Sequence, residues 1–125
     1  MNSAQIEKTV DELRLIEGLP PKSGEKQTDP HAAAIVALGQ AAGPYLVAKL
    51  TDDSPSRVAY GFRYSIGDVA LALLDEIYQP PYWPSPDGSV VIPTRYGDFR
   101  DYVAFVHSRK GRRQLQKSWK VFIKK

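Results

Sequence analysis

Histidines and paired carboxylates are the residues of this 125-residue chain whose types could support catalysis or metal binding. The two histidines are His31, which follows Pro30 in the first turn of an expected helix, and His107, near the end of another. A catalytic histidine needs a positioned partner and a group that orients it, and neither is evident beside these two. We therefore expect both histidines to have capping roles at the ends of helices, and we assign no catalytic residue.

The carboxylate pairs are Asp52 with Asp53, Asp75 with Glu76, and Asp68 with Asp75 two helical turns later. Metal binding or acid–base chemistry would need further ligands on the same face, and the pattern supplies none. We expect the first pair to mark a helix exit, Asp68 to cap a helix, and the others to be solvated surface charges. The chain has no cysteine, which excludes thiolate metal sites and thiol catalysis. We predict no enzyme, no metal and no other cofactor.

Charge is distributed unevenly along the chain. Residues 1–53 have five basic and eight acidic residues and residues 54–98 have three and five, whereas residues 99–125 have nine and one. The apolar fraction of 42% indicates a real core, and no run of about 18 apolar residues is present to span a membrane. The N-terminus lacks the pattern of a secretory signal. We expect a cytoplasmic protein, or a periplasmic one if a leader has been removed.

Capping residues and apolar spacing predict where two of the longer helices begin and which faces they bury. Asn2 and Gln5 make a capping-box pattern before a helix over residues 2–17, and Ser65 and Asp68 make another before a helix over 65–78. The first helix has its apolar face at Ile6, Val10, Leu13 and Ile16. The second has a broader face, made by Ile66, Val69, Ala70, Leu73, Leu74 and Ile77. That breadth predicts the central helix of the core.

Residues 29–53 predict two short antiparallel helices. Asp29-Pro30 suits the start of the first, because the aspartate accepts free amides and proline needs no amide there. Gly39 then ends that helix, and Gly43-Pro44 begins the next.

The stretch ALGQAAGPYLVAKLTDD, within residues 32–53, resembles one HEAT-type repeat. It has a leucine–glycine turn, a proline that opens the second helix, a leucine-rich face and an aspartate-rich exit. The resemblance implies stacked helix pairs with a concave protein-binding face. We expect one all-α domain over residues 1–125, a five-helix HEAT-like right-handed helical bundle or short α–α superhelix. Its long proline-rich loop, over 79–97, can hold a small β-hairpin that uses the apolar run Ser89–Ile92.

The end of the chain predicts two further helices, one beginning at Gly97-Asp98 and a last one beginning at Ser108. The last helix is amphipathic, with Leu115, Trp119, Phe122 and Ile123 on one face and Lys110, Arg113, Lys117, Lys120 and Lys124 opposite. Such a basic face suits plain solvent exposure, an acidic protein, or, less well, nucleic acid or an anionic membrane surface. Nucleic acid ranks lower because the aromatic residues lie on the apolar face, away from any bases.

Arginine and aromatic residues gather in two predicted loops. The loop over 54–64 has Arg57, Tyr60, Arg63 and Tyr64, and the loop over 79–97 has Tyr82, Trp83 and Tyr96. These residue types dominate the energetics of protein interfaces, although they could equally pack the loops onto the bundle. We predict a non-catalytic protein-binding module that uses these seven residues, an adaptor or a stoichiometric inhibitor like small bacterial immunity proteins. The alternative is a nucleic-acid or anionic-surface binder that uses the basic last helix.

Overall fold

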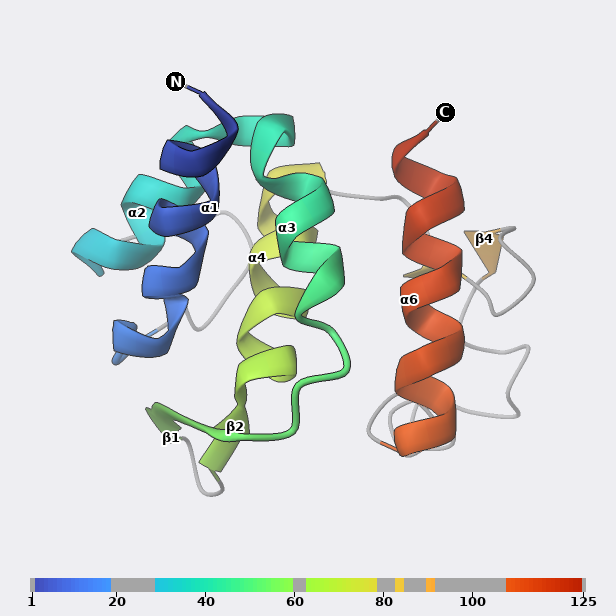
Figure 1. The fold of residues 1–125 in the computed structure, drawn as a ribbon. Coiled ribbons are helices and arrows are strands. Elements are labelled where there is room, and N and C mark those ends of the chain that lie inside the picture. Colours follow the sequence, from blue (N-terminus) through green and yellow to red (C-terminus); the bar gives the residue numbers. More distant parts are fainter. Residues whose placement is uncertain are drawn as a thin grey trace. The chain divides into compact units, whose positions relative to one another are not determined.

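The computed structural model describes residues 2–18, 29–59, 63–78, 83–84, 90–91 and 108–124 (Figure 1). The chain divides into two compact units, Met1–Gln79 and Pro80–Lys125, and the structure defines each unit separately. Whether they form one domain stays a prediction. The described residues are mostly helical, with small antiparallel sheets.

The first unit begins with helix α1, Ser3–Asp11, which continues as a 3-10 turn, Glu12–Leu15. The capping box is present: Gln5 N–H donates to Asn2 Oδ1 at 2.9 Å, and Asn2 N–H donates to Gln5 Oε1 at 3.0 Å. Val10, Leu13 and Ile16 are buried. The predicted start of this helix is therefore confirmed, and so is its buried face apart from Ile6, which is half-buried. The helical segment ends at Leu15, two residues before the predicted end.

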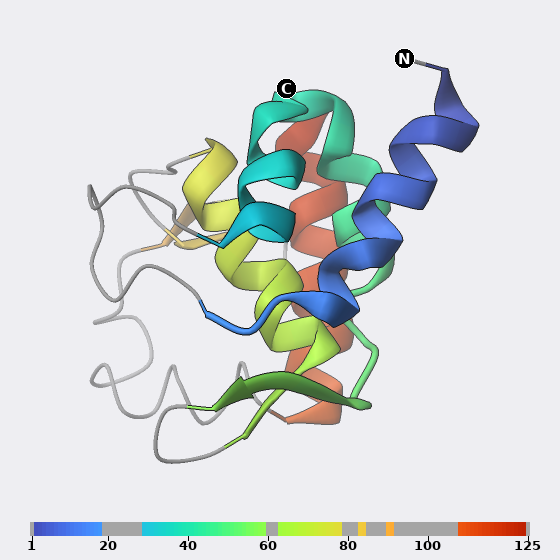
Figure 2. The same ribbon diagram turned by 90° about the vertical axis from the view of Figure 1, so that its left-hand side faces the viewer.

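Helix α2, Pro30–Ala37, a 3-10 turn, Gly39–Ala42, and helix α3, Gly43–Ala48, follow in succession (Figure 2). Asp29 caps α2 as predicted, and Gly39 ends it with a φ of +61°, a left-handed conformation that favours glycine. The buried residues of this segment are Ala32, Ile35, Ala42, Gly43, Leu46, Val47 and Leu50. The two helices and the turn between them are confirmed, but the predicted antiparallel arrangement is wrong, because the second helical segment is bent by 105° from the first. The resemblance to a HEAT repeat stays a prediction.

The sequence predicts a loop over residues 54–64, and that prediction is wrong. Strands β1, Pro55–Ala59, and β2, Arg63–Ser65, form an antiparallel hairpin in which Pro55 pairs with Ser65 and Ala59 with Arg63. The all-α expectation is corrected with it. Hydrophobic alternation did not reveal β1 because the strand is short and one of its two buried residues is Ser56.

Helix α4, Ile66–Tyr78, is the central element of the first unit, as predicted, and it contacts α2, α3, β1 and β2. Ser65 N–H donates to Asp68 Oδ2 at 2.9 Å and Asp68 N–H donates to Ser65 Oγ at 3.0 Å, which confirms the second capping box. Its buried apolar residues are Ile66, Val69, Ala70, Leu73 and Leu74.

The first turn of α4 lies close against the end of α3. Gly67 N–H donates to the carbonyl oxygen of Asp52 at 2.8 Å. A side chain at Gly67 would collide with the carbonyl oxygen of Leu50. Glycine is therefore required here for close approach of two backbones, although its φ is ordinary.

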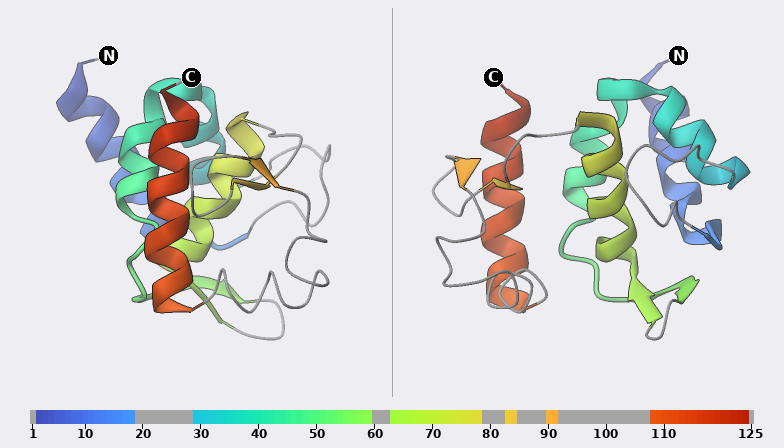
Figure 3. Two further views of the ribbon diagram at one scale, coloured as in Figure 1. Left: turned by 90° about the vertical axis from the view of Figure 1, so that its right-hand side faces the viewer. Right: turned by 180° about the vertical axis from the view of Figure 1, so that it is seen from behind.

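The second unit contains a small hairpin and the last helix (Figure 3). Strand β3, Trp83–Pro84, pairs antiparallel with β4, Val90–Val91, and β3 contacts helix α6, Arg109–Ile123. The hairpin in the proline-rich stretch is thus confirmed. Ser108 begins α6 as predicted, since its Oγ accepts a hydrogen bond from Gly111 N–H at 2.9 Å. The helix predicted from Gly97-Asp98 lies outside the described residues, as does His107.

Candidate interaction surfaces

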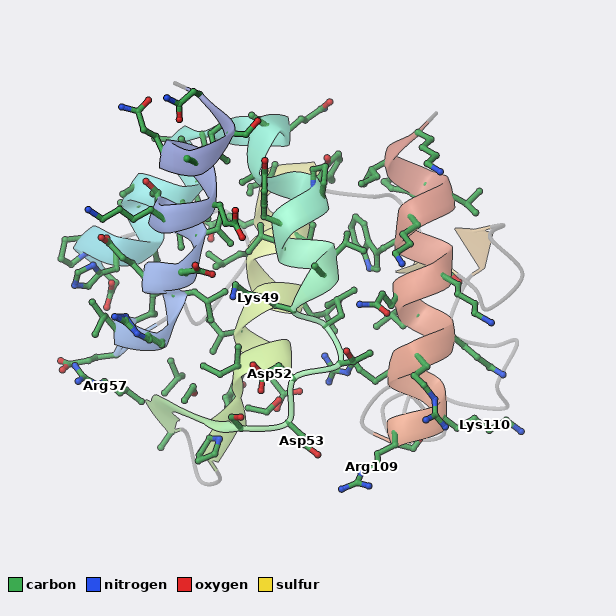
Figure 4. The ribbon with its side chains drawn as sticks, viewed as in Figure 1. Lys49, Asp52, Asp53, Arg57, Arg109 and Lys110 are labelled. Carbon is green, nitrogen blue, oxygen red and sulfur yellow. The ribbon has the colours of Figure 1, made fainter. Side chains whose placement is uncertain are left out.

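Arg57 is presented to solvent by strand β1. Pro55, Arg57 and Ala59 are exposed, whereas Ser56 and Val58 between them are buried. The Arg57 side chain is 58% exposed, and its Nη1 lies 3.9 Å from Oε1 of Glu17, itself 75% exposed. An ion pair this long and this exposed to solvent contributes little to the stability of the fold. The guanidinium group can therefore engage another molecule without breaking a strong contact (Figure 4).

Buried polar contacts hold the strand that carries Arg57. Ser56 Oγ donates to the carbonyl oxygen of Tyr64 at 2.6 Å and accepts from Val58 N–H at 3.1 Å. These bonds lie where the pairing of β1 with β2 is irregular, between Pro55 and Ala59. Because the serine hydroxyl group bonds a carbonyl of β2 and an amide of β1, it links the two strands where their register is irregular.

Two of the seven predicted partner-binding residues can be placed in full. Arg57 and the half-buried Tyr64 lie on the paired strands of one hairpin. Tyr60, Tyr82 and Tyr96 lie outside the described residues, and so do the side chains of Arg63 and Trp83, whose backbones belong to β2 and β3. Use of these residues in binding stays a prediction.

The acidic residues after α3 lie where the chain leaves this helix, as expected. Asp52 Oδ1 accepts a hydrogen bond from Ser54 N–H at 2.9 Å, and Asp53 beside it is exposed (Figure 4). Lys49 Nζ lies 2.7 Å from Oδ1 of Asp11 in α1. Within the described part of the chain, no three His, Asp or Glu side chains gather where they could hold a metal ion.

Asp29 has a wider role than the helix cap that the sequence predicts. Its Oδ1 accepts from His31 N–H at 3.0 Å and Ala32 N–H at 3.2 Å, while its Oδ2 accepts from Glu17 N–H at 2.9 Å and Gly18 N–H at 3.3 Å. One carboxylate thus ties the segment after α1 to the start of α2. Burial acts to raise the pKa of Asp29, but these four amides hold it below its usual value.

His31 lies in the first turn of α2, as the sequence predicts, with its Nδ1 3.7 Å from Oε2 of Glu12. Both side chains are more than a third exposed. A pair this exposed gives little energy.

The carboxyl group of Asp75 is buried, so its expected place on a solvated surface is wrong. The residue as a whole is half-buried, but Oδ1 is out of contact with solvent and has no hydrogen-bond partner among the described residues. Burial raises the pKa of this carboxyl group to about 7. The sequence held a signal for this, because no other polar residue interrupts α4 between Asp68 and Asp75. A helix that is apolar all round is buried on every side.

Helix α6 has the two faces that the sequence predicts. Leu115 and Trp119 are buried, and the rings of Trp119 and Phe122 meet edge to face with centroids 5.2 Å apart. The exposed residues include all five of the predicted basic face: Lys110, Arg113, Lys117, Lys120 and Lys124. Arg112 was missed. It is buried on the apolar side, as its spacing of three and seven residues before Leu115 and Trp119 could have indicated.

Among the described residues, no single helix is long and apolar enough to cross a membrane, although Pro30–Ala37 and Gly39–Ala48 pass that test together as a pair bent by 105°. Comparisons of the chain with protein-family models, with curated proteins and with solved structures found no match.

Proposed function

We propose that the chain is a non-catalytic protein-binding module, an adaptor or a stoichiometric inhibitor of the immunity-protein kind, that contacts its partner through the β1–β2 hairpin. The observation that carries this proposal is the solvent-exposed side of strand β1. It presents Arg57 to solvent between two residues that are buried in the core.

The β1–β2 hairpin already pairs the strand that carries Arg57. Binding of a partner protein there would therefore require little ordering of the backbone. Arginine is enriched at interface hot spots, since its flat guanidinium group buries area and keeps five donors. Tyr64 on the paired strand supplies a half-buried ring of the type that often accompanies arginine there.

The alternative function, binding of nucleic acid or an anionic surface, is favoured by the exposed basic face of α6. Its weakness is the placement of Trp119, the one aromatic residue of α6 that is fully buried. A buried ring cannot stack on bases, which is the usual source of affinity for single strands.

Affinity capture with matched arginine variants tests the proposal. Arg57→Ala removes the arginine on β1, and Arg14→Ala removes another exposed arginine from the same unit. The immobilised chain should retain one protein in stoichiometric amount, the Arg14→Ala chain should retain it equally, and Arg57→Ala should lose most of it. Capture that is equal in both variants, or no stoichiometric protein at all, would count against the hairpin as the binding surface.

A further inference from the structure

We propose that the outward face of α6 is a docking surface for an acidic helical segment of a partner protein. The basic stripe is defined here as Lys110, Arg113, Lys117, Lys120 and Lys124. The proposal rests on the protein-binding function above and gives it a second surface and a class of partner.

The stripe is straight and one-sided. Its members recur at alternating spacings of three and four residues, so that at about 100° per residue they fall within a sector of roughly 80°. With a rise of about 1.5 Å per residue, the stripe extends over about 21 Å of the helix. All five side chains are exposed.

The positive charge of the stripe is not balanced within the helix. Arg109–Ile123 contains no acidic residue, and no described residue forms an ion pair with any of the five. Like charges three and four residues apart repel each other and weaken a helix. A partner with negative charges along the same line would relieve that repulsion.

The shape of the stripe favours a polypeptide over nucleic acid. A helix that enters a DNA groove meets a phosphate backbone on both of its flanks, and the cations of α6 occupy one narrow sector. A partner helix with carboxylates at spacings of three and four would instead place them on a matching line. Val121, 45% exposed beside the stripe, adds an apolar contact of the kind that a protein side chain fills.

The same residues count against a membrane surface. Helices that lie in the membrane interface insert a free apolar face. In α6 the apolar face is not free to insert into a membrane, because Leu115 and Trp119 are already buried. Val121 is the exposed large hydrophobic residue of the described chain.

Four of the five cations are lysines, which predicts how the surface acts. A lysine is a flexible, strongly hydrated point charge, so it adds more to long-range attraction than to a packed contact. We therefore expect the stripe to raise the rate of association and make it sensitive to salt, with little effect on dissociation.

Two synthetic peptides of one composition test the chemistry. Both are alanine-based helices; one has glutamates at alternating spacings of three and four on one face, and the other has the same glutamates spread around the helix. The full chain should bind the one-faced peptide about fivefold or more tightly at low salt. Equal binding of the two peptides would overturn the proposal, as would tighter binding to a DNA duplex or to phosphatidylserine vesicles.

Two double variants with the same loss of charge test the location. Lys117→Gln/Lys120→Gln changes the stripe, and Lys8→Gln/Arg14→Gln removes two exposed cations from the first unit. The stripe variant should associate with the one-faced peptide roughly tenfold more slowly, and the control should change less than twofold. Equal effects of the two double variants would refute the basic stripe as the site where the peptide binds. Binding of the peptide does not involve Arg57, so an Arg57→Ala chain should still bind it. If the peptide experiments fail, the affinity-capture test of the β1–β2 hairpin is therefore unaffected.

Discussion

Replacement of Asp75 by asparagine should stabilise the fold at neutral pH. The Asp75 carboxyl group is buried, with its pKa raised from 3.8 to about 7, so the folded chain holds its proton more tightly than the unfolded chain. The contribution of the neutral acid to stability is complete below about pH 4 and is lost as the pH rises toward 7. Above pH 7 a charged carboxylate stays buried in the folded chain.

The size of the effect follows from the shift. A difference of about 3 pKa units corresponds to at most roughly 4 kcal/mol between low and neutral pH. The buried amide of asparagine has its own desolvation cost of about 1–3 kcal/mol. Asp75→Asn should therefore gain about 1–3 kcal/mol of unfolding free energy at pH 7.5 and gain nothing, or lose stability, at pH 4.

Urea unfolding followed by circular dichroism from pH 4 to pH 8 measures this directly. The difference in unfolding free energy between Asp75→Asn and the parent chain should rise with pH across this window. Glu7→Gln, which removes an exposed carboxylate from α1, serves as the charge control and should give a nearly flat difference. A flat difference for Asp75→Asn as well would refute the burial of this carboxyl group.

Three further substitutions test contacts that hold the first unit. Gly67→Ala should lower the unfolding free energy by about 1–3 kcal/mol, because the new Cβ meets the carbonyl oxygen of Leu50; a thermal melt unchanged by this substitution would show that the backbones can separate. Asp29→Asn should cost about 1–3 kcal/mol at pH 7, because its NH₂ group faces amides that need an acceptor. Since the pKa of Asp29 is lowered on folding, its contribution is present at neutral pH and is lost as the pH falls below 3.8, so the difference in stability between the two chains should shrink in acid. Ser56→Ala should cost about 1–3 kcal/mol and speed amide hydrogen exchange in the hairpin; unchanged exchange rates would contradict the bracing role of this serine.

Features that depend on neighbouring residues could be predicted from the sequence. The capping boxes at Asn2 and Ser65 each involve residues three positions apart, so their chemistry is visible in the order of the residues. The same holds for the N-cap at Asp29 and the turn at Gly39. The two faces of α6 could be predicted from its period, because Leu115 and Trp119 recur on one face and the lysines on the other.

Features that depend on distant contacts could not be predicted in this way. The hairpin of β1 and β2 uses a buried serine whose hydroxyl group links the two strands, and a serine in a short segment favours a loop. The second pair of amides on Asp29 comes from residues 17 and 18, twelve and eleven positions earlier in the sequence. Which exposed residues meet a partner is not a property of the chain's own folding, so the sequence indicates residue types there and no more.

The most direct test of the protein-binding function is calorimetric titration of the captured partner with the parent chain, Arg57→Ala and Arg14→Ala. We expect one saturable site, a dissociation constant raised about tenfold or more by Arg57→Ala, as for an interface hot spot, and no significant change with Arg14→Ala. Equal affinities for all three chains would contradict the assignment of the β1–β2 hairpin as the binding surface.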